Sequence, residues 1–89
     1  MSHGIEFVRK WDTTGDPVRF RVRLDGNDYD GRISHNALLY LSGDDPLSVD
    51  YNRAFSENLQ RILEIAGRVI QKNAADVVEF RISESDVRR

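Results

Sequence analysis

With 89 residues, the chain has the length of one domain whose modest hydrophobic core needs no metal or disulfide support. It contains no cysteine, which excludes disulfides, thiolate metal sites and a cysteine nucleophile and is typical of a cytoplasmic protein. The formal charge of −2 disfavours a dedicated nucleic-acid binder. The sequence shows neither a signal peptide nor an apolar segment of membrane-spanning length, so we expect no membrane partner.

The first two predicted elements are strands. Residues 5–10 alternate in hydropathy and predict a short strand, with Glu6 and Lys10 pointing away from the core. After a turn over residues 12–17, the segment 18–24 alternates apolar residues and arginines without a break. Because side chains along a strand point alternately to opposite faces, Phe20 and Val22 are expected in the core and three arginines on the outer face.

A hairpin follows at Asp25-Gly26, a pair typical of type I′ turns, where both central residues adopt positive φ. The returning strand is predicted over residues 29–34. This turn predicts that Arg23 lies opposite Asp28 and that Arg21 lies opposite Asp30, so opposite charges would meet across the strand pair.

Two helices and a last strand complete the predicted order. A short helix is expected over residues 37–42, with Ser34 as its N-cap and Gly43 at its end. A long amphipathic helix is predicted from Pro46 or Asp50 to Lys72. Within it, Gly67 suggests a close approach to a neighbouring element. Alternation over residues 78–82 predicts the final strand, and residues 84–89 are expected to form a frayed polar tail.

The order βββααβ predicts an α+β fold with a four-stranded, mostly antiparallel sheet. One short and one long helix are expected to pack on one face of this sheet. The whole chain, residues 1–89, is interpreted as one domain with a structured core over about residues 5–83.

The outer face of the predicted sheet is the candidate binding surface. Its arginines are Arg19, Arg21, Arg23, Arg32 and Arg81, interleaved with acidic residues. An arginine-rich sheet can hold phosphates, but single-strand binders also need aromatic side chains on which bases stack. The predicted strand alternation places no aromatic residue on this face, and Trp11 is expected in the core or at its edge. The simpler interpretation is a solvated, ion-paired face or a polar dimer surface.

The sequence offers little support for chemistry at a metal or a catalytic centre. Residues 26–34 resemble part of an EF-hand loop through Asp28 and Asp30, but Gly26 and Ala37 stand where a calcium loop needs an aspartate and a bidentate glutamate. His35 has no partner that the sequence identifies, and no nucleophile elbow or phosphate-binding glycine loop is present. We therefore expect no enzyme, no catalytic residue, no metal and no cofactor.

The chain resembles a small bacterial family of uncharacterised proteins of about this length. The likeness runs from Val18 to Asp86 and includes residues 18–22, the Asp25-Gly26 turn, residues 33–38 and the apolar positions of residues 55–70. It implies a compact α+β fold, a bacterial cytosolic origin and no established activity, although some relatives are labelled transcriptional regulators. Many members carry a cysteine just before the Ile33-Ser34 step, where this chain has Gly31 and Arg32, so no thiol-based role carries over.

Together these observations predict a non-enzymatic accessory or protein-interaction module that binds another protein or a second copy of itself. The alternative is a nucleic-acid-binding transcriptional regulator that uses the arginine-rich sheet face. A more remote alternative is calcium binding at the EF-hand-like segment.

Overall fold

The computed structural model describes residues 4–11, 15–72 and 79–88. Along the described chain the elements are β1 (Glu6–Lys10), β2 (Val18–Leu24), β3 (Asn27–Ile33), α1 (His35–Ser42), α2 (Tyr51–Glu57), α3 (Leu59–Lys72), β4 (Glu79–Ile82) and α4 (Glu84–Val87). The predicted α+β class and the predicted order of elements along the chain, βββααβ, are confirmed, although the described residues form four helices. The predicted start of the last strand at Val78 lies outside the described residues.

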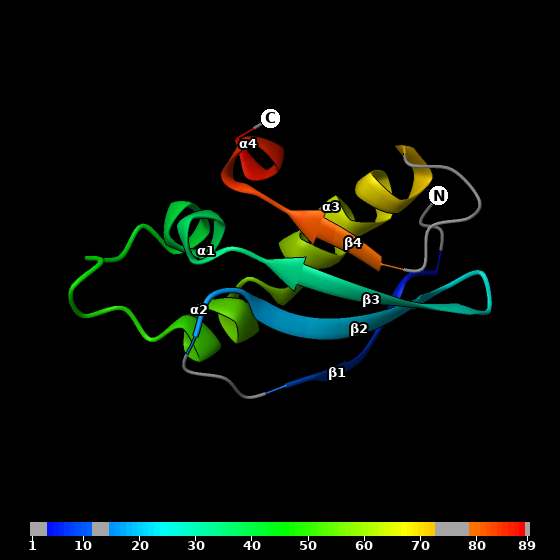
Figure 1. Cartoon of the computed structure of the whole chain (residues 1–89), viewed down its shortest axis with the longest axis horizontal. Helices are drawn as coiled ribbons and strands as arrows, with labels where there is room; N and C mark the ends of the chain where they lie inside the picture. The colour runs from blue at the N-terminus through cyan, green and yellow to red at the C-terminus, as the bar shows by residue number, and fades with distance from the viewer. Residues whose placement is uncertain (1–3, 12–14, 73–78, 89) are drawn as a thin grey trace.

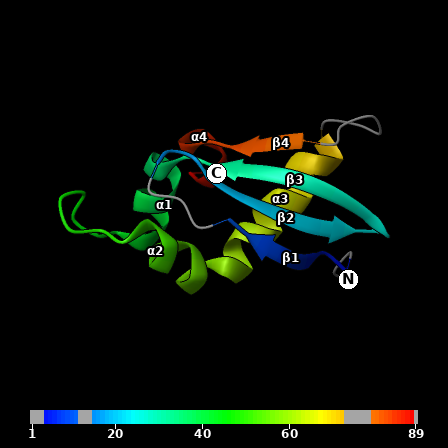
Figure 2. The same cartoon turned by 60° about the horizontal axis from the view of Figure 1, so that its bottom comes forward.

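The four strands form one sheet in the order β1-β2-β3-β4, with β1 and β4 at its edges (Figure 2). The β1–β2 and β2–β3 pairs are antiparallel, whereas β4 runs parallel to β3. The sheet is therefore mixed, and the prediction of a mostly antiparallel sheet is corrected. The reason is visible in Figure 1: α3 returns the chain to the hairpin end of the sheet, where β3 also begins, so β4 starts in the same direction.

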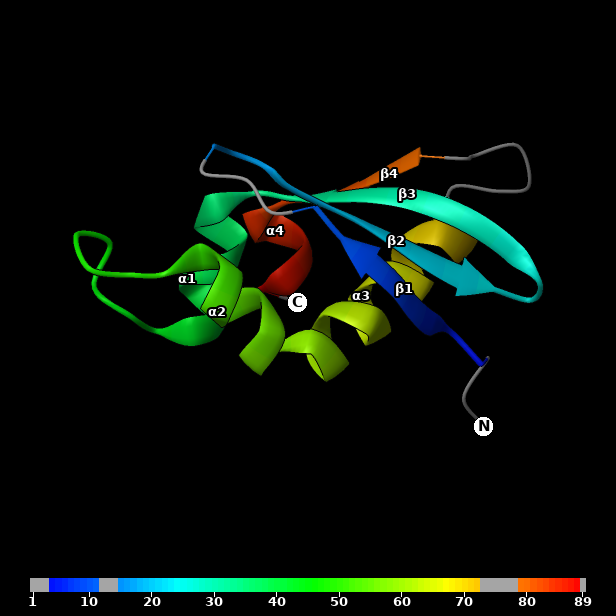
Figure 3. The ribbon, with the colours of Figure 1, turned by 90° about the horizontal axis from the view of Figure 1, so that it is seen from below.

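The helices lie on one face of the sheet, and no described element covers the opposite face (Figure 3). We call that uncovered side the outer face. The inward side chains of β2 are buried as predicted, because Phe20 and Val22 have no exposed surface. Phe20 packs against Phe55 of α2 and Phe80 of β4, with ring centroids 5.0 and 5.6 Å apart. The alternation in residues 18–24 thus fixes which side of the sheet becomes the core.

The predicted long helix is divided at Asn58 into α2 and α3. The side-chain Nδ2 of Asn58 donates to the carbonyl oxygen of Ala54 at 2.9 Å, and the backbone N–H of Asn58 donates to the same oxygen at 3.1 Å, so one carbonyl accepts two hydrogen bonds where the helix is interrupted. The first helical turn begins after Asp50, whose carboxylate accepts from the backbone N–H groups of Asn52 and Arg53. Gly67 makes no close approach, because a Cβ built there would meet only Ile5 Cδ1 at 3.9 Å.

The two ends of α1 confirm the predicted caps, although the helix begins two residues earlier than expected, at His35. Ser34 Oγ accepts from the N–H of Ala37 at 3.1 Å, and Gly43 ends the helix with a φ of 71°. Residues 84–89 were expected to form a polar tail, yet Glu84–Val87 form α4. This correction has a packing reason: Val87 is only 3% exposed and belongs to the hydrophobic core.

Candidate functional site

A β-bulge in β1 decides which side chains reach the outer face. Phe7 pairs with Val22 and Arg9 pairs with Arg21, so Val8 is an extra residue in β1. An extra residue reverses the alternation of every position after it. Arg9 therefore occupies the outer face, and the prediction that Lys10 lies there is wrong.

Lys10 instead faces the helices, where its Nζ donates to Asn52 Oδ1 at 2.9 Å. The same reversal carries Trp11 to the outer face, where its backbone N–H donates to the carbonyl oxygen of Arg19 at 3.0 Å. The expectation that Trp11 lies in the core or at its edge is corrected, because the expected alternation did not include the bulge.

Trp11 is surrounded by guanidinium groups. The Cζ atoms of Arg9, Arg21 and Arg19 lie 4.8, 5.5 and 5.9 Å from the centre of its ring. These distances fall within the range of cation–π attraction, in which the negative ring face meets a cation. An aromatic ring and a cluster of arginines are thus combined on a surface that no helix covers (Figure 3).

One line of residues crosses the whole sheet beside this ring. Arg19 of β2 is opposite Arg32 of β3, and Arg32 is opposite Arg81 of β4. We call Arg19, Arg32 and Arg81 the arginine row, and Trp11 continues it beyond β2. Neighbouring strands lie about 4.8 Å apart, so the line from Trp11 to Arg81 spans about 14 Å.

The next arginines along β2 are neutralised by the returning strand, as the hairpin register predicts. Arg21 Nε donates to Asp30 Oδ1 and Arg23 Nε donates to Asp28 Oδ1, both at 2.8 Å. The hydrogen bond from Arg23 lowers the pKa of Asp28, and the hydrogen bonds to Asp30 and Asp28 raise the pKa values of Arg21 and Arg23. These two cations are therefore already engaged within the protein.

The arginine row is less neutralised. Arg32 Nη2 lies 3.4 Å from Glu79 Oε1, a longer contact with both side chains exposed. Among the described residues, neither Arg19 nor Arg81 forms an ion pair. The five predicted arginines thus divide into two that are engaged by the hairpin carboxylates and three that form the row.

Within the described residues, the outer face carries six arginines and four carboxylates, a local excess of positive charge in a chain of net charge −2. They are Glu6, Arg9, Arg19, Arg21, Arg23, Asp28, Asp30, Arg32, Glu79 and Arg81. Sequence reasoning missed Arg9 and Trp11. The sequence shows that an arginine and a tryptophan two residues apart share one side of the strand. Only the bulge shows that this side is the outer face.

A shallow hollow of about 260 Å³ lies at the β4 end of the arginine row, lined by Asp16, Pro17, Arg32, Ser34 and Arg81. Asp16 Oδ1 accepts from the backbone N–H of His35 at 3.0 Å, which joins Asp16 to the start of α1. The hollow therefore has a defined rim and two arginine side chains.

Asp28 and Asp30, the residues of the calcium alternative, lie on β3, and each is bonded to an arginine. No group of three or more metal-ligating side chains gathers within residues 4–11, 15–72 and 79–88. The other histidine of the chain, His3, lies outside the described residues. The ring of His35 stacks on Tyr51 with centroids 3.6 Å apart, and its buried Nε2 has no hydrogen-bond partner there.

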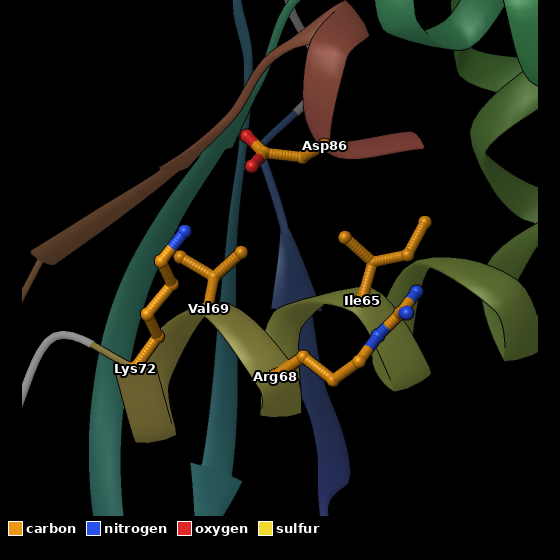
Figure 4. A pocket seen from close by; sticks show the side chains of 5 residues that line it. All are labelled: Ile65, Arg68, Val69, Lys72 and Asp86. Carbon is orange, nitrogen blue, oxygen red and sulfur yellow. The ribbon is translucent and has the colours of Figure 1, made fainter. Parts of the chain in front are cut away.

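A second hollow, of about 200 Å³, lies between α3 and α4 (Figure 4). Ile65 and Val69 point from α3 towards α4, while the side chain of Arg68 runs along the helix. Asp86 Oδ2 accepts from the N–H and the hydroxyl of Ser83 at 2.8 and 3.0 Å. Its carboxylate therefore serves to cap α4, and the outer face remains the stronger candidate site.

These features define an α+β protein with one sheet, one helical layer and an arginine-rich outer face that carries a tryptophan. Over residues 5–82 the sequence matches the family model described as "Protein of unknown function (DUF1488)", and the chain belongs to this family. The predicted membership of a small family of unknown function is thereby confirmed. In the described part of the chain, no helix has the length and apolar character needed to cross a membrane.

The fold is similar to a solved structure, a protein of unknown function from the DUF1488 family of Shewanella loihica PV-4, determined at 1.60 Å. The TM-score is 0.67 and the sequence identity is 22%, over 92% of this chain and 94% of that chain. At this identity the likeness shows a shared fold. No curated protein matches the sequence.

Proposed function

We propose that the protein is a non-enzymatic binding module that holds an anionic partner on the outer face of its sheet. The observation that carries the proposal is the arginine row, in which three neighbouring strands place arginines opposite one another on the face that no described helix covers. Arginine presents a planar fork of donors that matches carboxylate and phosphate groups. The module would work in the cytoplasm, for which its cysteine-free composition is suited.

The surroundings of the titratable groups support a binding role over catalysis. General acid–base catalysis needs a titratable group within hydrogen-bond reach of a reacting group. The Nε2 atom of His35 is buried next to Tyr51 and has no hydrogen-bond partner among the described residues. Asp28 and Asp30 are bonded to arginines, and Asp86 caps α4.

An anionic partner fits the outer face better than an apolar protein surface does. The exposed large hydrophobic side chains form no row across the sheet: Phe7 and Val8 lie on the edge strand β1, Tyr40 on α1 and Leu47 in the loop after α1. On the sequence alone, one reason against a nucleic-acid partner was that no aromatic residue was expected beside the arginines. The position of Trp11 removes that reason.

A titration with generic polyanions tests this proposal. Adding a heparin oligosaccharide or poly-glutamate to the 15N-labelled protein at low salt should shift the amide signals of Trp11, Arg19, Arg32 and Arg81. The shifts should disappear at high salt, because counterions screen exposed charges. Light scattering on the same samples reports whether a second copy is involved. Signals that stay unchanged on the outer face at low salt would refute the proposal.

A further inference from the structure

We infer that the arginine row and Trp11 together bind single-stranded nucleic acid. This inference rests on the proposed function, since it names the anionic partner of the same surface. It joins two observations: a line of guanidinium groups without a full set of carboxylate partners, and an aromatic ring at one end of that line. Phosphates would lie on the arginines, and a base would stack on the indole.

The phosphate side of the site follows from the ion pairs. Arg19 and Arg81 have no carboxylate partner among the described residues, and Arg32 has a weak one at 3.4 Å. These guanidinium groups can bind a phosphate without first leaving a strong internal partner. Arg21 and Arg23 would have to break hydrogen bonds of 2.8 Å. The row is therefore the part of the face that is free to bind phosphate.

The base side of the site follows from Trp11. Stacking on an aromatic ring tolerates any base, because every base has a flat π face. In the free protein the guanidinium of Arg9 lies 4.8 Å from the indole centre. A base can replace this cation on the ring. The line of about 14 Å from Trp11 to Arg81 gives room for roughly two or three nucleotides.

Single-stranded nucleic acid fits these two features better than other polyanions do. An acidic peptide offers carboxylates to the arginines but no ring for Trp11 unless it also carries an aromatic residue. A duplex keeps its bases stacked within the helix, so they cannot lie on the indole. Because the net charge of the chain is −2, nucleic acid is attracted only by the local excess of arginine on the outer face. We therefore expect binding that is weak and that falls steeply with salt.

The salt dependence has an expected size. Three phosphate contacts on a single strand give a slope of about −2 in log affinity against log salt. Raising the salt from about 50 to 200 mM should then weaken binding about 20-fold. Because the chain contains one tryptophan, its intrinsic fluorescence reports directly on the proposed stacking position.

The experiment compares three probes by tryptophan fluorescence and by anisotropy of labelled probe: an oligothymidylate of about ten nucleotides, an abasic strand of the same length, and poly-glutamate. The oligothymidylate should quench Trp11 and bind more tightly than the other two. Equal binding of the first two probes would overturn the inference and leave the proposed function standing. Binding of poly-glutamate alone would also overturn it and would identify an acidic protein segment. No binding to any probe at low salt would overturn both.

Four variants make the test specific. Trp11→Ala should weaken binding of the oligothymidylate about 5- to 150-fold, to the level of the abasic strand. Trp11→Phe keeps a stacking ring and should stay close to wild type when binding is followed by anisotropy. The double variant Arg19→Gln/Arg81→Gln should lower the salt slope from about −2 to about −0.7.

Arg53→Gln is the matched control, because Arg53 is an exposed arginine on α2, on the opposite side of the sheet. It should bind as wild type does. Circular dichroism checks that each variant is folded. If Trp11→Phe lost binding as fully as Trp11→Ala, or if Arg53→Gln lowered the slope as much as the double variant, the inference would fail.

Discussion

Replacing Gly31 with alanine should destabilise the protein, because the space for a side chain at this position is already filled. Gly31 lies buried in the middle of β3, opposite Phe20 of β2 and Phe80 of β4. A Cβ built on Gly31 would lie 2.9 Å from Phe20 Cζ and closer still to the Phe80 ring. These two rings also contact each other in a T-shaped arrangement with centroids 5.6 Å apart. Neither ring can move without disturbing the other.

The size of the effect follows from two opposing contributions. Overpacking a well-packed core costs about 1–3 kcal/mol. Replacing glycine by alanine at an ordinary backbone position stabilises by about 0.4–1 kcal/mol, because the unfolded chain loses freedom. Gly31 is not among the residues with positive φ, so this second contribution applies. The net expectation is a loss of about 1–2 kcal/mol, or about 5–15 °C in Tm for a chain of this length.

Urea unfolding followed by circular dichroism measures this loss. The matched control is Gly67→Ala on α3, where the new Cβ meets only Ile5 at 3.9 Å. It should stabilise by up to about 1 kcal/mol, since glycine is a poor helix former. Phe80→Leu should relieve the crowding, so the double variant Gly31→Ala/Phe80→Leu should lose less than the sum of the single changes. A Gly31→Ala protein as stable as wild type would refute this reasoning.

Three further outcomes are expected from single changes. Asp50→Ala removes the N-cap of α2 and should cost about 1 kcal/mol in urea unfolding; an unchanged midpoint would contradict the cap. Val87→Ala should cost up to about 1.5–3 kcal/mol because Val87 is buried, whereas a frayed tail would show no loss. Arg23→Gln should raise the pKa of Asp28 towards its ordinary value in an NMR titration. Because that pKa is lowered in the folded protein, the pair stabilises above the unfolded pKa and the effect is lost as the pH falls through the folded pKa. An Asp28 pKa that does not change in Arg23→Gln would show that Arg23 is not the cause.

The hairpin was predictable because all of its signals are local. The alternation over residues 18–24 identifies the core face, and the Asp25-Gly26 turn fixes the register of the return strand. Asp25 and Gly26 adopt the positive φ values, 54° and 82°, that this turn requires. The register then brings Arg23 to Asp28 and Arg21 to Asp30 without any further information.

The candidate site was only partly predictable. The five arginines could be placed on the outer face by alternation alone, because they follow regular strand positions. Trp11 could not, because the bulge at Val8 has no glycine or proline to mark it in the sequence. Which arginines stay available for a partner also depended on the pairing of β3 with β4, which places Glu79 near Arg32.

Gly31 is a second position where the sequence gives part of the information and tertiary packing gives the rest. In this chain the rings of Phe20 and Phe80 occupy the space beside Gly31. The sequence shows only that residue 31 is a glycine and has no side chain. The packing of residues far apart in the chain shows what takes its place.

By itself, the sequence determined the α+β class, the core side of β2, the hairpin and the caps of α1, because each depends on neighbours a few residues apart. Tertiary structure decided the parallel direction of β4, the burial of Val87 and the outward position of Trp11. Each of these depends on contacts between distant segments, which compete with local preference and, in these places, override it.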